Sequence, residues 1–344
     1  MNLLLAGDFK GDERAEWVAA LAEALPGHRL CLARAELPAE QIDAAIVANP
    51  PPGSLAGLPA LRLIQSLWAG VDRLLGDATL PADVPVARMV DPAMNQAMAE
   101  TALWATLALQ RGFFGYARQQ QAGHWRQWPQ QRADEWPVLV LGLGQMGRAV
   151  AGRLQQNGYP VVGWRRGADA GASAGAHAGT PVGAHVGAPV GAHVGALAPE
   201  STPLPGVTVL CGAQALGPAL ARARVLINLL PLTPDTHGLI DARLLAALPR
   251  GAALVNLARG AHVVDADLLA ALHSGHLGQA VLDVFQGEPL AADHPYWRHP
   301  GVMMLPHVAA QTDVRSAAAV VAGNIEALAS GGPVRHLVQR AAGY

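Results

Sequence analysis

Residues 138–147 read Val-Leu-Val-Leu-Gly-Leu-Gly-Gln-Met-Gly, and this stretch decides the fold class of the 344-residue chain. Four apolar residues typical of a buried strand run directly into a GxGxxG turn, and a helical pattern follows. Strand, glycine turn and helix in this order make the dinucleotide-binding unit of a parallel α/β sheet. Because free amides at the start of such a helix bind phosphate, we predict that a dinucleotide contacts Gly142, Gly144, Gln145, Met146 and Gly147.

The same alternation of strand and helix continues on both sides of this turn. Short apolar runs alternate with amphipathic stretches along the chain, which predicts an α/β fold with doubly wound parallel sheets. We expect one long helix over residues 97–121. We expect strands at residues 3–6, 44–47, 61–65, 86–89, 160–164, 225–229, 253–256, 279–283 and 302–305.

The composition excludes several classes of protein. Hydrophobic residues make up 51% and charged residues 15%, which excludes a disordered polyelectrolyte. With 24 basic and 26 acidic residues there is no basic surplus for nucleic acid or anionic lipid. Apolar runs stay below the ~18 residues of a membrane span, and the short N-terminal run does not resemble a signal peptide. Two distant cysteines make neither a disulfide framework nor a four-cysteine zinc site, so we expect a cytoplasmic protein without a metal.

One segment departs from this organisation. Residues 175–195 read GAHAGTPVGAHVGAPVGAHVG, with glycine at every fourth position. Small side chains and recurrent proline cannot build a packed core, so we predict a flexible insertion over residues 167–205. The histidines of this tract, His177, His185 and His193, recur every eight residues, which would suit a metal. A solvated low-complexity tract is the interpretation we favour.

The strand after the glycine turn ends where a dinucleotide site recognises the adenosine ribose. NAD-binding sites place an acid there, whereas this chain has Arg165 and Arg166. Two guanidinium groups can bind a 2′-phosphate bidentately, which predicts a preference for NADPH, with NADH as the alternative cofactor. Two solvated loop arginines are the plainer interpretation.

Three further apolar runs each end near one polar residue: Arg259, Glu288 and His307. The carboxyl ends of parallel strands meet at one edge of a sheet, so we expect these side chains to converge. Arginine can hold a carboxylate, histidine can protonate a carbonyl, and glutamate can orient the histidine and raise its pKa. Taken singly, each has a structural interpretation as a surface ion pair, a turn cap or a loop histidine.

These residues resemble the motifs of a known family. The glycine turn is joined by Asn256-Leu-Ala-Arg259-Gly260, Leu282-Asp283-Val-Phe-Gln-Gly-Glu288-Pro289 and Pro306-His307-Val-Ala-Ala. Together they are similar to the D-isomer-specific 2-hydroxyacid dehydrogenases. The resemblance implies two Rossmann-like domains with the active site in the cleft between them. A substrate domain would comprise residues 1–102 and 309–344, and an NAD(P)-binding domain residues 103–308.

The resemblance also implies further site residues and a partner. Substrate would contact Trp68, Ala69 and Gly70, together with the catalytic Arg259 and His307. The cofactor would lie beside Trp164, Leu230, Pro231, Thr236, Ala258 and Asp283. Family members dimerise through an arm matched here by the aromatic residues Phe113, Phe114, Tyr116, Trp125 and Trp128, so we expect a homodimer; an ordinary core beneath the helix is the alternative.

The activity implied is NADPH-preferring reduction of a 2-keto acid to a D-2-hydroxy acid, with glyoxylate and hydroxypyruvate as substrates. Two alternatives stay open. One is a dehydrogenase for a bulkier 2-keto acid, and the other is a non-catalytic module that senses NAD(P). Turnover over a panel of keto acids discriminates between them.

Overall fold

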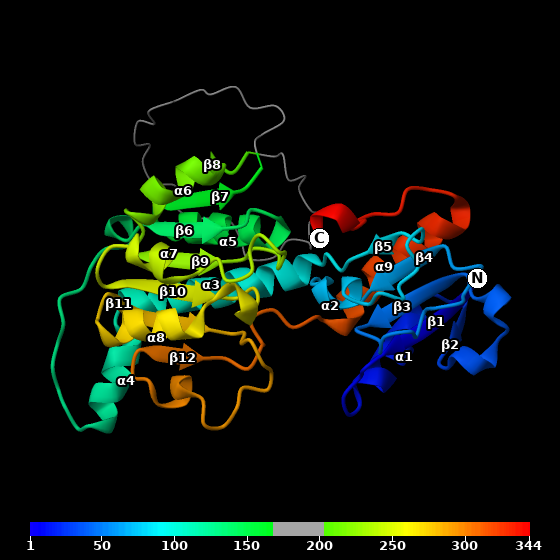
Figure 1. The fold of residues 1–344 in the computed structure, drawn as a ribbon, viewed down its shortest axis with the longest axis horizontal. Helices are drawn as coiled ribbons and strands as arrows, with labels where there is room; N and C mark the ends of the chain where they lie inside the picture. The colour runs from blue at the N-terminus through cyan, green and yellow to red at the C-terminus, as the bar shows by residue number, and fades with distance from the viewer. Residues whose placement is uncertain (168–202) are drawn as a thin grey trace.

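The computed structural model describes residues 1–167 and 203–344, which form two parallel β-sheets flanked by helices (Figure 1). The five-stranded sheet has the order β2-β1-β3-β4-β5, with β1 (Asn2–Gly7), β2 (Arg29–Cys31), β3 (Ala44–Ala48), β4 (Leu63–Ser66) and β5 (Val86–Ala87). The seven-stranded sheet has the order β12-β11-β10-β9-β6-β7-β8, with β6 (Val138–Leu141), β7 (Val161–Arg165), β8 (Val207–Cys211), β9 (Val225–Asn228), β10 (Ala252–Asn256), β11 (Leu277–Leu282) and β12 (Val302–Met304). The predicted doubly wound α/β architecture is confirmed.

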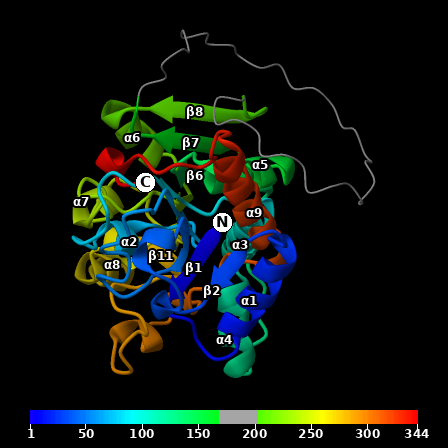
Figure 2. The same ribbon diagram turned by 90° about the vertical axis from the view of Figure 1, so that its right-hand side faces the viewer.

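Helices cover both sheets. On the first sheet lie α1 (Glu13–Ala24), α2 (Asp72–Leu75) and α9 (Val314–Ser330), and α1 and α9 pack side by side (Figure 2). The others are α3 (Pro92–Gln110), α4 (Phe113–Gln121), α5 (Gln145–Gln156), α6 (Ala213–Leu220), α7 (Ala242–Ala246) and α8 (Asp265–His273). The last helix therefore returns to the sheet that begins the chain. Its buried residues Ala317, Val321 and Ile325 share a core with Leu3 and Ile46.

The predicted single helix over residues 97–121 is wrong. The structure has α3, which packs against α5, and a separate α4. Between them Gly112 adopts a left-handed conformation with φ of 71°, which ends the helical path. The start of α3 is also earlier than expected, because the Asp91 carboxylate accepts a hydrogen bond from Ala93 N and Pro92 occupies the first turn.

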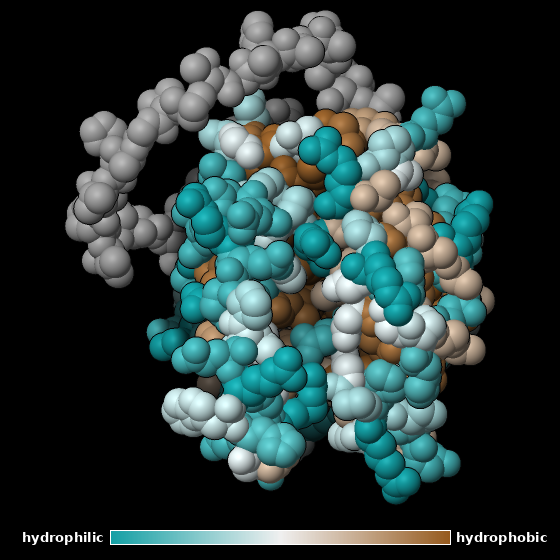
Figure 3. All heavy atoms as spheres, turned by 90° about the vertical axis from the view of Figure 1, so that its left-hand side faces the viewer, coloured by the Kyte–Doolittle hydropathy of each residue, from teal (hydrophilic) through white to brown (hydrophobic). Residues whose placement is uncertain are grey.

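Two edge strands, β2 and β8, were not predicted from the sequence. Both lie at the margin of a sheet and are incompletely buried: β2 has one buried residue, and β8 contains only exposed and partly buried residues, unlike the continuously buried central strands. The predicted insertion over residues 167–205, including His177, His185 and His193, lies almost wholly outside the described residues. In the described ranges, no helix is long and apolar enough to cross a membrane. Figure 3 shows a mostly hydrophilic face on the seven-stranded side.

Candidate active site

The glycine turn has the close packing that a dinucleotide cradle requires. Gly142 follows β6 with φ of 91°, and a Cβ there would lie 2.8 Å from the Leu229 carbonyl oxygen. A Cβ on Gly147 would lie 1.8 Å from the Gly142 carbonyl oxygen. Gly144 is the N-cap of α5, so the N-terminal end of this helix, which favours an anion, lies at the turn. The turn therefore fits a bound pyrophosphate.

The two arginines at the end of β7 have separate protein contacts. The Arg165 Nε donates to Cys211 Sγ at 3.3 Å. The Arg166 Nη1 lies 2.7 Å from Asp235 Oδ2, and the Asp235 side chain is 80% exposed. A 2′-phosphate at this strand end would compete with Asp235 for Arg166.

Two residues predicted to contact a cofactor use their side chains within the protein. The Trp164 ring is buried, and its Nε1 donates to the Gly212 carbonyl oxygen at 2.8 Å. Thr236 Oγ1 is also buried and donates to the Pro231 carbonyl oxygen at 2.7 Å. Leu230 is buried as well. These side chains shape the loops, and an open pocket beside them is lined by Leu232, Thr233, Pro234 and His237.

His307 and Glu288 form a hydrogen-bonded pair. His307 Nδ1 lies 2.7 Å from Glu288 Oε2, and Glu288 Oε1 accepts a hydrogen bond from Phe285 N at 2.9 Å. The hydrogen bond with Glu288 raises the pKa of His307, against opposing effects of burial and of Arg259. Burial would raise the pKa of Glu288, but its hydrogen bonds with His307 and Phe285 hold that pKa below its ordinary value. The pair therefore favours a protonated imidazole beside a carboxylate.

The loop that carries His307 is fixed by Asp283. Both oxygens of this buried carboxylate accept backbone hydrogen bonds, from Val308 N at 2.7 Å and Ala309 N at 3.0 Å. His307 N donates to the Asp283 carbonyl oxygen at 2.9 Å, and His307 itself has φ of 56°. Burial raises the pKa of Asp283. The structure thus gives Asp283 a direct role in placing the imidazole.

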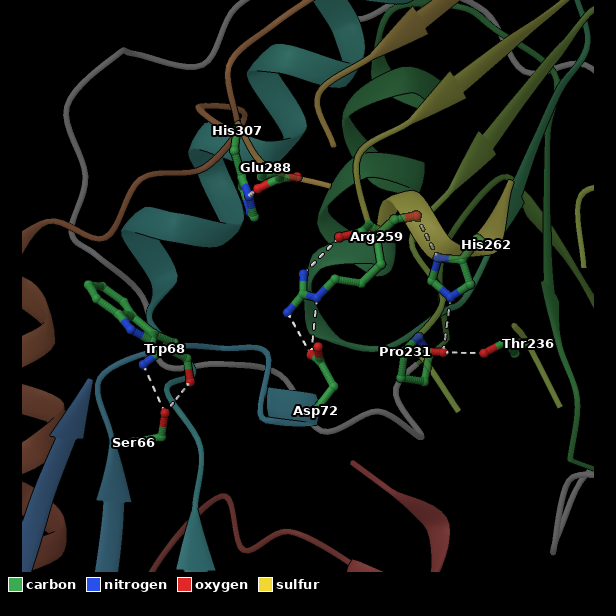
Figure 4. Close-up of polar contacts among 10 residues, drawn as sticks. Ser66, Trp68, Asp72, Pro231, Thr236, Arg259, His262, Glu288 and His307 are labelled. Atoms are coloured by element: carbon green, nitrogen blue, oxygen red, sulfur yellow. Dashed lines mark hydrogen bonds and ion pairs between the residues drawn. The ribbon is translucent and has the colours of Figure 1, made fainter. Parts of the chain in front are cut away.

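Arg259 follows β10, and its side chain extends to the loop and helix α2 that follow β4 of the other sheet. Its Nε and Nη2 each lie 3.0 Å from Asp72 Oδ1, and its Nη1 donates to the Ala258 carbonyl oxygen at 2.7 Å (Figure 4). A Cβ on Gly70 would lie 1.4 Å from Arg259 Nη2, so only glycine permits this approach. The guanidinium is therefore packed directly against the loop that follows β4.

That loop offers backbone donors beside the guanidinium. Trp68 N already donates to Ser66 Oγ at 3.0 Å, and the Trp68 ring points away from Arg259, toward Trp17 with ring centroids 6.2 Å apart (Figure 4). Among the described residues, the amides of Ala69, Gly70 and Val71 have no acceptor. Free amides next to a guanidinium suit a carboxylate. The predicted substrate loop is thus brought to Arg259 through residues 69–71, whereas the Trp68 amide is occupied.

Sequence reasoning missed three buried polar residues beneath this site. Asn228 Nδ2 donates to Asn256 Oδ1 at 3.0 Å, and Asn256 Nδ2 donates to the Arg259 carbonyl oxygen at 2.9 Å. His262 is fully buried, with its ring nitrogens 3.2 Å from the Arg259 and 3.3 Å from the Pro231 carbonyl oxygen. The available signal was an asparagine ending each of two apolar strands. These side chains fix the backbone that carries Arg259.

Comparisons with known proteins agree with this geometry. Residues 103–183 and 179–309 match the family model described as "D-isomer specific 2-hydroxyacid dehydrogenase, NAD binding domain". A glyoxylate/hydroxypyruvate reductase A of Serratia proteamaculans is 36% identical over 351 residues, covering 100% of both chains.

Two solved structures are similar over their whole length. A D-isomer-specific 2-hydroxyacid dehydrogenase of Xanthobacter autotrophicus, in complex with NADPH and MES, is 37% identical with a TM-score of 0.85, covering 100% of this chain and 99% of that one. An NADPH-dependent glyoxylate/hydroxypyruvate reductase of Sinorhizobium meliloti, in complex with NADP and sulfate, is 33% identical with a TM-score of 0.82 and the same coverage. The chain therefore belongs to the D-isomer-specific 2-hydroxyacid dehydrogenases, a family of NAD(P)-dependent oxidoreductases.

Proposed function

We propose that this protein reduces glyoxylate to glycolate and hydroxypyruvate to D-glycerate, with NADPH as the preferred reductant. The observation that carries the proposal is the His307–Glu288 pair, which lies in the same site as a guanidinium packed against free backbone amides. A charged imidazole and an anion site together suit a small 2-keto acid. The relatives named for this activity, and the NADPH and NADP in solved relatives, support the choice of substrate and cofactor.

In the proposed reaction, the substrate carboxylate binds to Arg259 and the amides of Ala69, Gly70 and Val71. A bound NADPH supplies the hydride that the keto carbon accepts. The carbonyl oxygen takes a proton from His307 Nε2, because Nδ1 is engaged by Glu288, and His307 ends neutral. Glu288 holds the ring and stabilises its charged form until the proton leaves.

The cofactor would lie along the edge formed by β6, β7, β9 and β10. Its pyrophosphate would meet Gly142, Gly144 and the α5 amides, and its 2′-phosphate Arg165 and Arg166. Leu230, Pro231, Ala258 and Asp283 would contact the nicotinamide end. On this proposal, residues 103–308 bind the cofactor, and residues 1–102 with 309–344 supply the substrate loop.

The test is the initial rate of NADPH and of NADH oxidation, each with glyoxylate and with hydroxypyruvate. We expect fast turnover with NADPH and slow turnover with NADH, because the strand end carries arginines rather than an acid. Turnover with NADH alone would contradict the proposal that Arg165 and Arg166 bind a 2′-phosphate. Absence of turnover with both small acids would contradict the proposal and direct the assay to bulkier 2-keto acids.

Replacing Glu288 by glutamine is expected to change the pH dependence of reduction. The reaction needs protonated His307, so kcat/KM falls as the pH rises through the histidine pKa. Glu288 raises that pKa, so E288Q moves the fall to lower pH while NADPH binding is retained. The check is kcat/KM for glyoxylate from pH 5 to 10 in both proteins, with the exposed Glu100→Gln on α3 as a control. Superimposable profiles would contradict the role of Glu288.

We also propose a homodimer formed through α3, α4 and the arm that follows. Large apolar side chains are exposed there: Trp104, Leu107 and Phe113 are 39%, 37% and 54% exposed, and Trp125 is 95% exposed. Exposed large apolar residues, aromatic ones above all, are typical of an interface. Sedimentation equilibrium should give twice the 35.6 kDa chain mass, and the chain mass itself for a Trp125→Ala, Phe113→Ala variant. A monomeric unaltered protein would contradict the proposal.

A further inference from the structure

Asp72 contacts the catalytic Arg259 but takes no part in the proposed reaction itself. It begins α2 on the five-stranded side, and its partner Arg259 follows β10 on the seven-stranded side, 187 positions away. Both side chains are about one-third exposed, at 31% and 30%. The pair is thus a partly buried contact between the two halves of the site.

The hydrogen bonds of the guanidinium explain what this contact does. Arginine carries five N–H groups. Nε–H donates to Asp72 Oδ1, and one Nη1–H donates to the Ala258 carbonyl oxygen. Nη2 lies 3.0 Å from Asp72 Oδ1 as part of the ion pair. At least one N–H group is therefore left on each terminal nitrogen, which is what a carboxylate needs for a bidentate contact.

The guanidinium that Asp72 holds is packed directly against Gly70. Arg259 Nη2 lies so close to Gly70 that a single added carbon would overlap it. A long arginine side chain has large rotamer freedom, which an ordering contact must remove before substrate arrives. Asp72 supplies that contact from the loop whose amides at residues 69–71 face no protein acceptor in the described structure.

We propose that Asp72 is a positioning residue, which fixes Arg259 against the 69–71 loop so that guanidinium and amides bind the substrate carboxylate together. This inference rests on the proposed function. Asp72 acts through Arg259 and does not itself contact the reacting atoms. If Asp72 instead competed with substrate for Arg259, removing its carboxylate would lower KM and strengthen oxalate binding.

The experiment measures KM and kcat for glyoxylate, and oxalate affinity of the NADP-loaded protein by titration calorimetry, in Asp72→Ala and Asp72→Asn. We expect D72A to raise KM and weaken oxalate binding roughly tenfold or more, as for a lost hydrogen bond to a charged group, with a smaller change in kcat. D72N keeps an oxygen acceptor and should recover part of the loss. Asp134→Ala, which removes the acid of the exposed Arg132–Asp134 pair, is the matched control.

A double-mutant cycle separates positioning from general damage. In an Arg259→Ala background, D72A should cause no further loss, because the residue it positions is absent. An equal loss in both backgrounds, or a lower KM in D72A, would overturn the proposal while leaving the proposed function intact. If the unaltered protein neither reduced glyoxylate nor bound oxalate, the proposed function would fail, and this inference with it.

Discussion

Replacing His307 by glutamine should lower kcat for glyoxylate reduction by roughly 10²- to 10⁴-fold, the range expected when a general acid is removed. The imidazole is held on one side by Glu288 at 2.7 Å, and its backbone is held by Asp283. Nε2 is therefore the nitrogen that can deliver a proton. Glutamine keeps the volume and polarity of the side chain but cannot donate an acidic proton at neutral pH.

The measurement is kcat with saturating NADPH, together with NADPH affinity by fluorescence titration, which should stay unchanged. His273→Gln on α8 is the control, since that ring contacts His299 and the Leu269 carbonyl oxygen instead. The variant should also lose the alkaline fall of the pH profile. A residual rate within a few fold of the unaltered protein would mean that another group provides the proton.

Removing Arg259 should weaken both binding and turnover of the keto acid. A hydrogen bond to a charged group contributes about 1.5–3 kcal/mol, which corresponds to roughly 10- to 150-fold. Arg259→Ala loses two such donors, so we expect kcat/KM to fall by at least the upper end of that range. Asp72 is also left without its partner, which places an uncompensated carboxylate beside the bound acid.

Arg259→Lys makes this prediction more specific. Lysine keeps the charge but cannot reach Asp72, the Ala258 carbonyl oxygen and a substrate carboxylate at once, so it should restore only part of the loss. Arg132→Ala, at an exposed pair, controls for loss of a positive charge. The assays are kcat and KM for glyoxylate and hydroxypyruvate. Unchanged kinetics in Arg259→Ala would contradict the proposal that Arg259 binds the substrate carboxylate.

Much of the fold was predictable because its signals are local. The central strands are continuous apolar runs, and the GxGxxG turn follows one of them directly, so a window of ten residues identifies the unit. The break between α3 and α4 was missed because Gly112 looks tolerable within a helical pattern. The edge strands were missed because their side chains are not consistently buried.

The site was predicted only in part, because some of its signals are local in the sequence and others are not. Arg259, Glu288 and His307 each follow an apolar run, and parallel strands bring such positions to one edge. Whether a side chain faces the site or the core depends on packing against distant residues. Trp164 illustrates this: it lies at the predicted strand end, yet its ring enters the core and bonds to Gly212.

The sequence by itself determined the α/β class, the dinucleotide turn and the three polar residues at strand ends. Each of these features depends on a short run of neighbouring residues whose pattern fixes the local geometry. Tertiary structure alone decided that Asp72 contacts Arg259, that the Arg259 guanidinium packs against Gly70, and that Asn228, Asn256 and His262 support the Arg259 backbone. Asp72 and Arg259, for example, are separated by 187 positions. The contacts of Arg259 with Asp72 and Gly70 arise only when the two sheets are packed together, and no local pattern encodes the distance between them.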